Sequence, residues 1–401
     1  MQSYKKISKA ILNYDLEYFI SKYLGEDLTK VTFQLSKKID SEELGLLIDQ
    51  LKLYKKARSK FPTFTKAFCF FTTKSFEQAT SEHLAKFKSS LFKGNTLLDI
   101  SGGLGVDDWA FSNTFSKIIS LDKDDMLNEI VRRNFEKLGI TNVERLDIDA
   151  YEFIQSFMQF DLIYLDADRR SNDRNERLIG LSYSEPNILE IKSRLFEISD
   201  KILIKLSPMI DINELLNEIN EVSDVYVISL DNEVKEVLAL LKKESEVTPT
   251  ICAINLHEGK QQEFSAKLHQ NEEILFSDEG SFFYEPSLSL IKSGISMVYA
   301  MNHQLFMIAK NSYFFISDNI VNNFFGRSFK IVSKIEFSKS KVKKYLSENG
   351  IIKGNISKRN FPATVDELKE VFSIKDGGEE YLFFTQNESK QKLMFHCRKI
   401  N

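Results

Sequence analysis

The sequence predicts an α/β protein built around a parallel sheet, and three observations carry that prediction. First, the apolar run 96–100 passes through a glycine-rich turn at 101–105 into a segment with helical periodicity. Second, apolar runs and helix-like segments alternate from about residue 93 to residue 260. Third, four consecutive apolar runs end in acidic residues. Since open α/β sheets bind ligands at the carboxyl ends of their strands, we expect a nucleotide-like cofactor at this edge.

The glycine-rich turn defines the first candidate site. Glycine at 103 and 105 suits a loop with positive φ that approaches a ligand closely. A dinucleotide-binding loop has a third glycine three residues after the second, where this chain has Asp108. The sequence therefore argues against a nicotinamide cofactor. The candidate ligands in this loop are Asp99, Ser101, Gly102, Gly103 and Gly105.

The next three strands also end in polar residues. The second predicted strand, 117–122, ends at Asp122, about twenty residues past the loop, where a carboxylate can accept both ribose hydroxyls. A helix at 126–138 closes at Gly139 and leads to a third strand, 143–150, which runs into an acidic turn. The fourth strand, 160–165, is followed by Asp166. Any one of these acids could instead cap the helix that follows it.

Composition limits the class of protein. Apolar residues make up 42% and charged residues 28% of the 401 residues, with three widely spaced cysteines. This is the composition of an ordinary globular protein of two or three domains, and it suggests no disulfide framework and no metal site. No apolar run approaches the roughly 18 residues of a membrane span, and residues 1–18 lack an export signal. We expect a cytoplasmic protein, and its oligomeric state is left open.

Four regions follow one another along the chain. Residues 1–92 form a predicted helical region, in which apolar residues from Leu44 to Leu51 keep helical spacing behind an Asp40–Glu43 capping box. Residues 93–260 form the cofactor domain, with later strands at 201–206, 224–229 and 236–241, and residues 261–329 form a small domain. Residues 330–401 are expected to be strand 330–337, helix 339–348, strand 351–357, helix 364–372 and two strands that meet near Asn387. The second of these helices opens with a Thr364–Glu367 capping box.

The C-terminal region differs from the rest in charge. Residues 330–401 contain fifteen Lys and Arg against nine Asp and Glu, whereas the whole chain has a net charge of −4. A basic module beside an acidic body suggests contact with nucleic-acid phosphates. The alternative is an ordinary solvated lysine surface.

Short segments in one order then carry a resemblance. The chain resembles a bacterial family of class I S-adenosylmethionine-dependent methyltransferases that end in a THUMP-like domain preceded by a small ferredoxin-like domain. The resemblance implies a Rossmann-like, seven-stranded sheet, an N-terminal helical region, C-terminal α+β domains and an RNA substrate. In the loop, Ser101 replaces the family's usual first glycine. The matching segments are Phe76–Glu82, Leu98–Asp107, Asp166–Arg170, Ser184–Asn187, Lys205–Met209, Asn232–Glu236, Tyr284–Pro286, Phe325–Arg327 and Ser357–Pro362.

The resemblance also implies roles for residues outside the loop. Asp122 and Lys123 would lie at the ribose of S-adenosylmethionine, and Asp149 with Ala150 at the adenine. The segment that holds Gln78, Ser81 and Glu82 would pack beside the methionine end of the cofactor. Helix capping alone is the alternative for this segment.

Methyl transfer to a nitrogen of an RNA base is the predicted reaction. Asp166 would orient the acceptor, while Arg169 and Arg170 would hold a phosphate or a base edge. Asp168 is either a second acceptor or a solvated acid, and either arginine could simply pair with a nearby acid. Ala167 and Asp168 stand where related enzymes carry prolines, which leaves the target chemistry open.

Lys358 and Arg359 are the predicted RNA contacts in the C-terminal region. The alternative is that Arg359 and Phe361 dock this region against its neighbour. Two other functions stay open from the sequence. One is a methyltransferase for a small molecule or a protein, with the basic region as a dimer contact. The other is a non-catalytic RNA-binding protein whose methyltransferase domain has decayed at Ala167 and Asp168.

Overall fold

The chain folds into two compact units. The computed structural model describes residues 14–155, 158–166, 168–169, 181, 184–244, 248–257, 259–268 and 275–400. Unit 1 comprises Met1–Lys205 with Leu240–Glu244, and unit 2 comprises Leu206–Ala239 with Ser245–Asn401. Among the described residues, no helix combines the length and apolarity that a membrane span requires.

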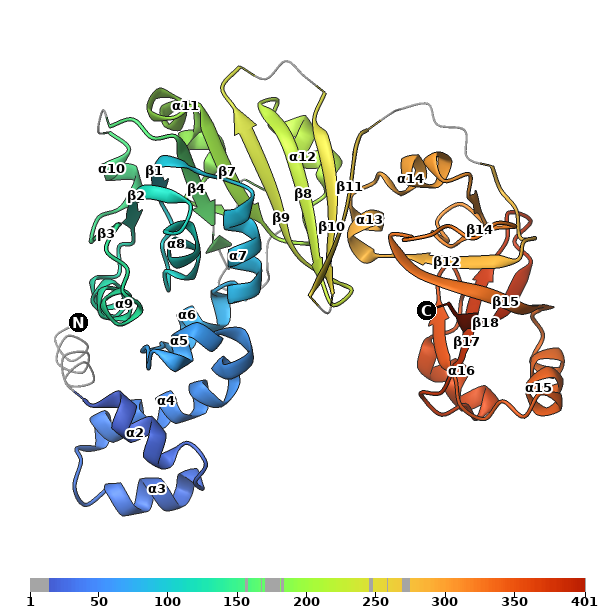
Figure 1. The fold of residues 1–401 in the computed structure, drawn as a ribbon, viewed down its shortest axis with the longest axis horizontal. Coiled ribbons are helices and arrows are strands. Elements are labelled where there is room, and N and C mark those ends of the chain that lie inside the picture. Colours follow the sequence, from blue (N-terminus) through green and yellow to red (C-terminus); the bar gives the residue numbers. More distant parts are fainter. Residues whose placement is uncertain are drawn as a thin grey trace. The chain divides into compact units, whose positions relative to one another are not determined.

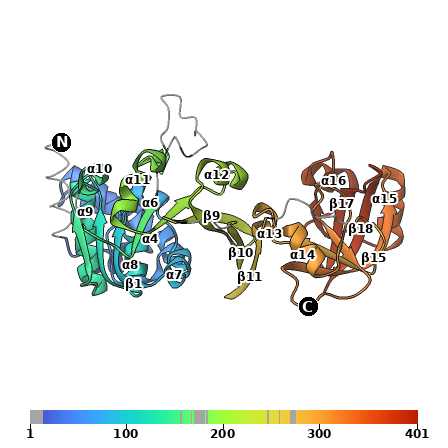
Figure 2. The same ribbon diagram turned by 90° about the horizontal axis from the view of Figure 1, so that it is seen from above.

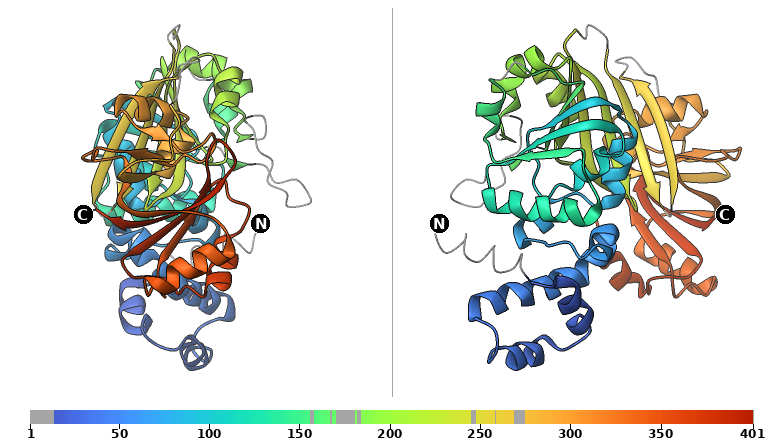
Figure 3. Two further views of the ribbon diagram at one scale, coloured as in Figure 1. Left: turned by 90° about the vertical axis from the view of Figure 1, so that its right-hand side faces the viewer. Right: turned by 60° about the vertical axis from the view of Figure 1, so that its left-hand side comes forward.

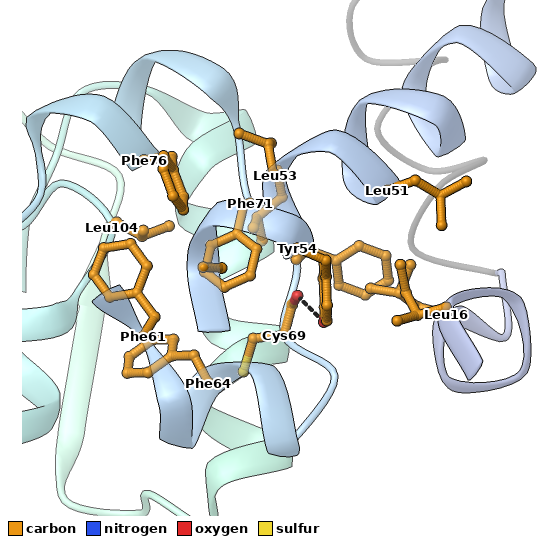
Figure 4. Packing of buried hydrophobic residues seen from close by; sticks show 14 of the residues in the cluster. Leu16, Leu51, Leu53, Tyr54, Phe61, Phe64, Cys69, Phe71, Phe76 and Leu104 are labelled. Carbon is orange, nitrogen blue, oxygen red and sulfur yellow. Dashed lines mark hydrogen bonds between the residues drawn. The ribbon is translucent and has the colours of Figure 1, made fainter. Parts of the chain in front are cut away.

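Unit 1 begins with helices, as the sequence predicts. Asp40 caps the longest of them, since its Oδ1 accepts from the Glu42 amide, and the apolar residues Leu44, Leu47 and Leu51 are buried. The helices share one apolar core, which includes Trp109 and other residues from the sheet part of the unit (Figures 1 and 4). Their bounds are α2 (Leu16–Tyr23), α3 (Leu28–Leu35), α4 (Ser41–Lys60), α5 (Pro62–Lys66), α6 (Thr73–Gln78) and α7 (Glu82–Ser90).

The sheet of unit 1 has parallel strands in the order β7-β4-β1-β2-β3, and the last residues of β9 belong to the same unit. Helices α5 to α7 join this sheet to the helices α2 to α4 (Figure 3). Gly139 ends α9, as predicted, and its backbone adopts the left-handed conformation. The elements are β1 (Gly94–Asp99), α8 (Val106–Phe111), β2 (Phe115–Leu121), α9 (Asp125–Leu138), β3 (Val143–Leu146), α10 (Ala150–Phe153), β4 (Leu162–Asp166), β5 (Asp168–Arg169), β6 (Ser184–Glu185), α11 (Ile188–Ile198) and β7 (Lys201–Leu206).

Unit 2 begins with α12 and four strands in the order β11-β10-β8-β9. Asp231 and Asn232, both with positive φ, form the two-residue turn between β8 and β9, the geometry that suits a tight hairpin. Strand β9 continues into residues that belong to unit 1. The bounds are α12 (Ile212–Glu218), β8 (Val222–Leu230), β9 (Glu233–Lys242), β10 (Thr250–His257) and β11 (Lys260–Lys267).

A second sheet, with the strand order β13-β14-β12-β15-β18-β17-β16, occupies the rest of unit 2. Strands from 282–317 thus pair with strands from 326–399. Helix α16 opens with the predicted Thr364–Glu367 capping box. The elements are β12 (Phe282–Pro286), α13 (Leu288–Lys292), α14 (Ser296–Asn302), β13 (Phe306–Met307), β14 (Phe315–Ser317), β15 (Gly326–Glu336), α15 (Lys339–Glu348), β16 (Asn355–Lys358), α16 (Val365–Phe372), β17 (Glu380–Gln386) and β18 (Lys392–Lys399).

Strands β17 and β18 of this second sheet are buried on both faces along their middle residues. Along β17, Leu382 and Phe384 face a core that includes apolar residues of α15 and α16, which lie beside the strands in Figure 2. Phe383 faces the opposite core with Phe283 and Phe314. Alternation along one strand therefore fills two separate apolar layers.

The three cysteines are buried and unpaired. Burial raises the pKa of Cys69 to about 12 and raises the pKa of Cys252 and Cys397 as well.

Candidate cofactor-binding site

Three glycines of the loop between β1 and α8 differ in what a side chain at their position would meet. A Cβ at Gly102 would overlap the Arg145 guanidinium. Gly105, with φ +74°, caps α8, and a Cβ there would lie 2.7 Å from Phe135 of α9. Gly103, with φ +49°, differs because the nearest described atom to a Cβ there would be the Ser101 carbonyl oxygen, at 3.7 Å. Among the described residues, nothing therefore crowds the loop at Gly103.

Ser101 connects the loop to the neighbouring strand β4. Its Oγ donates to Asp99 Oδ1 at 3.0 Å and accepts from the Asp166 amide at 2.6 Å. The Ser101 amide also donates to Asp99 Oδ1 at 2.8 Å. The serine at the family's glycine position therefore links the two predicted site acids through one hydroxyl.

Asp122, the predicted ribose ligand, lies against the loop. Its Oδ2 accepts from the Gly103 amide at 3.1 Å, and its Oδ1 accepts from the Asp124 amide at 2.9 Å. The Asp122 side chain is 20% exposed, so a ligand can still reach the carboxylate. Lys123, next in the chain, is exposed. The structure thus brings Asp122 and Gly103 together, as the spacing predicted.

Asp99 and Asp108 form a buried pair of carboxyl groups below the loop. Burial and the neighbouring Asp108 raise the pKa of Asp99 well above its usual range, and burial also raises the pKa of Asp108. Asp108 Oδ2 accepts from Ser120 Oγ at 2.6 Å and from Arg145 at 3.1 Å. No described residue donates to Asp108 Oδ1 in its ionised form. A proton on Asp99 lets one carboxyl donate to the other.

Asp99→Asn is expected to remove a pH dependence of stability. Because the folded state holds its proton above the unfolded pKa, the contribution of Asp99 to stability is lost as pH rises through the raised pKa. Asparagine keeps an acceptor for Ser101 and adds a permanent donor toward Asp108. Melting temperatures from about pH 4 to pH 8 should therefore decline less steeply in the variant.

Asp99→Ala is the control for that prediction. It removes the acceptor of both Ser101 bonds and supplies no donor, so it should cost about 1–3 kcal/mol at every pH. A decline with pH that is the same in Asp99→Asn as in the parent would contradict the shared-proton interpretation.

A fully buried lysine, Lys88, contacts the start of the helix that follows the loop. Lys88 of α7 has no exposed side-chain surface, and its Nζ donates to Asp107 Oδ1 at 3.0 Å and to the Tyr164 hydroxyl at 2.8 Å. Tyr164 in turn donates to Asp107 Oδ2 at 2.8 Å. This triad, which sequence reasoning missed, fixes the first turn of α8 against β4.

At the end of β4, Asp166 forms an ion pair with Lys205, a residue that sequence reasoning did not place in the site. Lys205 is its register partner at the end of β7, and Lys205 Nζ lies 2.6 Å from Asp166 Oδ2. The Asp166 side chain is 31% exposed. Lys60 lies within electrostatic range, since burial and the charge of Lys205 lower the pKa of Lys60 to about 8. Lys60 Nζ donates to the carbonyl of Phe76 at the end of α6.

The segment predicted to lie beside the methionine end of the cofactor is engaged in helix capping. Ser81 Oγ accepts from the Leu84 amide and so caps α7. Glu82 is buried, and its Oε1 accepts from the Thr63 and Phe64 amides at the start of α5. Gln78, the last residue of α6, is exposed. These contacts fit the capping alternative, and a cofactor role for the segment stays a prediction.

The remaining candidates in unit 1 lie at the other strand ends. Asp149 caps α10 through the Tyr151 amide at 2.8 Å, and Ala150 is buried in the first turn of that helix. The structure places the backbone of Asp168 and Arg169 in β5, paired with β6. The predicted actions of those two side chains, and the prediction for Arg170, lie outside the described residues.

In unit 2, three matching segments from the sequence converge on Glu285. This buried carboxylate pairs with Arg327 and accepts from Ser357 Oγ at 2.8 Å. Arg359 lies 3.9 Å from the same carboxylate, donates to the Tyr313 carbonyl at 2.8 Å and stacks 4.8 Å from the ring centre of Phe314.

The two residues predicted to contact RNA, Lys358 and Arg359, have different surroundings. Arg359 has only 16% of its side chain exposed, so its geometry fits the docking alternative. Lys358 is half-buried, and its Nζ donates to the Phe361 carbonyl at 3.3 Å. An RNA contact by either residue stays a prediction.

Comparison with known proteins bears on both units. Residues 326–399 match a family described as THUMP domain-like. The chain also matches the crystal structure of a "putative methyltransferase" from Porphyromonas gingivalis W83, with a TM-score of 0.87, 26% identity and coverage of 99% of each chain. An rRNA methylase from Streptococcus thermophilus matches 41% of this chain and 96% of its own, at 13% identity and a TM-score of 0.31. No curated protein matches in sequence. The predicted fold class is confirmed.

Proposed function

We propose that this class I methyltransferase, with its C-terminal THUMP-like domain, transfers a methyl group from S-adenosylmethionine to a base nitrogen of tRNA or rRNA. One observation carries the proposal: the Gly103 amide donates a hydrogen bond to Asp122, the predicted ribose ligand. This bond joins the loop that follows β1 to the acid that follows β2. The family match at residues 326–399 supports the choice of RNA as substrate.

The residues present fit S-adenosylmethionine, which supplies an electrophilic methyl group on a sulfonium. The space beside Gly103 is open, and the acids around it suit a cationic ligand. Asp122 and Lys123 would hold the ribose, Asp149 and Ala150 the adenine, and Gln78, Ser81 and Glu82 the methionine end.

Asp166 would orient the acceptor. Lys205 holds its Oδ2, and the Ser101 hydroxyl holds its amide, so the carboxylate has a fixed position. Oδ1 accepts from no described donor and would receive the N–H of the acceptor base. Arg169 and Arg170 would hold a phosphate or base edge. The catalytic contribution of the chain is then mainly alignment of donor and acceptor.

Mass spectrometry of RNA from cells with and without the gene tests the proposal. One methylated nucleoside should disappear with the gene, and the purified chain with S-adenosylmethionine should restore it in RNA from the deletion cells. Calorimetry with S-adenosylhomocysteine tests the cofactor separately. Cofactor binding with unchanged RNA would support a small-molecule or protein substrate, and NADH binding would contradict the cofactor assignment.

We expect substitutions of Lys358 and Arg359 to have different effects on RNA binding and on stability. Lys358→Glu is expected to weaken RNA binding and to lower its salt slope by about one, because one phosphate contact is lost. Arg359→Ala should instead cost about 2–3 kcal/mol of stability, since its guanidinium holds buried carbonyls. Filter binding at two salt concentrations beside melting curves measures both.

Lys55→Glu, a charge reversal at an exposed position of α4, is the control for that assay. Its RNA affinity and salt slope should equal those of the parent chain. A slope for Lys358→Glu that also equals the parent slope would remove Lys358 from the RNA interface.

A further inference from the structure

A buried arginine in β3 contacts the glycine loop and the strand and helices around it. Arg145 has 1% of its side chain exposed, and an unpaired guanidinium at that depth would be strongly destabilising. Its Nε donates to Asn128 Oδ1 at 2.5 Å, and its Nη1 donates to Ser120 Oγ at 2.8 Å and to Asp108 Oδ2 at 3.1 Å. The guanidinium thereby joins β2, α8 and α9 to β3.

The remaining nitrogen reaches the two groups that the proposed cofactor needs. Arg145 Nη2 donates to the Gly103 carbonyl at 2.7 Å and lies 3.6 Å from Asp122 Oδ2. The Gly103 amide donates to that same Asp122 oxygen. Arg145, Gly103 and Asp122 therefore form a closed triangle in which the loop and the acid share one cation.

Gly102 allows this contact. A Cβ at that position would overlap the Arg145 guanidinium and the Ser120 hydroxyl. The loop can therefore lie directly on the guanidinium only because residue 102 lacks a side chain. The absence of a side chain at Gly102 thus makes room for the Arg145 guanidinium. A Cβ at Gly103 would instead clash with no described atom.

We propose that Arg145 is a positioning residue of the cofactor site, which sets the Asp122 carboxylate and the Gly103 backbone in the arrangement that binds the cofactor ribose. The inference rests on the proposed function. Arginine suits this task because its planar fork places several donors at fixed angles, whereas lysine offers one charged nitrogen at a single point.

A double-mutant cycle tests the proposal on the full chain. Arg145→Lys should weaken the affinity for S-adenosylhomocysteine at least tenfold by calorimetry, because the loop and Asp122 lose their shared cation. In an Asp122→Ala background the same change should have an effect below about threefold, because the group that it positions is already absent. Melting curves of all four proteins accompany the titrations.

Arg132→Lys is the matched control. Arg132 of α9 donates to the Arg145 carbonyl and to Asp147 at the surface, and among the described residues it makes no hydrogen bond to the loop. Its affinity should equal that of the parent. If Arg145→Lys fails to fold, Ser120→Ala removes one bond to Nη1 and should show a smaller loss with the same dependence on Asp122.

The outcomes separate this inference from the proposed function. Equal losses from Arg145→Lys in both backgrounds would overturn the positioning role and leave the cofactor assignment intact. Failure of the parent chain to bind S-adenosylhomocysteine would overturn both.

Discussion

Asp166→Ala is expected to lower the turnover of methyl transfer about a hundredfold or more, the scale of a lost proton-accepting or aligning group. Its affinity for S-adenosylhomocysteine should stay within about threefold of the parent value, since the proposed contact is to the acceptor. The carboxylate lies at the end of β4, and Lys205 together with Ser101 fixes its position. Single-turnover rates with deletion-strain RNA and calorimetry measure the two quantities.

Asp161→Ala provides a matched control, because Asp161 precedes the same strand at its opposite end and bonds the amides of Asn95 and Thr96. That variant should lose stability and keep its turnover. Equal losses of turnover and cofactor affinity in Asp166→Ala would make Asp166 a cofactor or folding residue. Full activity would remove it from the site.

Gly103→Val is expected to abolish cofactor binding. Its side chain would extend beside the loop, where the nearest described atom to the Cβ is the Ser101 carbonyl oxygen at 3.7 Å, and would fill the proposed cofactor space. The change also forces a branched side chain into φ +49°, which costs roughly 1–2 kcal/mol. Calorimetry with S-adenosylhomocysteine should detect no binding at concentrations that saturate the parent chain.

Gly139→Val is the control that separates backbone strain from the loss of cofactor space. Gly139 ends α9 at φ +70°, and a Cβ there would meet no described atom within 4 Å. The backbone cost should therefore be similar, while cofactor affinity should stay at the parent value. If Gly103→Val bound the cofactor as tightly as Gly139→Val does, the open space beside Gly103 would not be the cofactor site.

Local patterns in the sequence were enough to predict the strand, loop and helix around Gly103 and the caps at Asp40 and Thr364. Each depends on residues within a few positions of one another. The strand predicted at 351–357 is partly wrong, because the observed strand β16 begins at Asn355. Ile351 lies just after the end of α15, where its amide donates to the Leu346 carbonyl and its side chain is buried. An apolar residue after a helix can pack onto that helix as well as begin a strand.

Long-range partners explain what the sequence did not predict. Lys88 meets Tyr164 across 76 positions of the chain, and Arg359 meets Tyr313 across 46. No local periodicity distinguishes these cations from lysines and arginines on a solvated surface. Asp122 could be placed beside the loop because consecutive strands of a parallel sheet lie side by side, a rule that relates positions far apart in sequence.

The burial of all three cysteines gives the chain a practical chemical property. A thiol with a pKa of about 12, as at Cys69, is ionised in roughly one molecule in 10⁵ at neutral pH, and only the thiolate reacts with alkylating reagents. A cysteine introduced at a partly exposed position, such as Lys358, would be modified far faster than the buried Cys69, Cys252 or Cys397. A photo-crosslinker attached there would mark the bound nucleotide without prior removal of the native thiols.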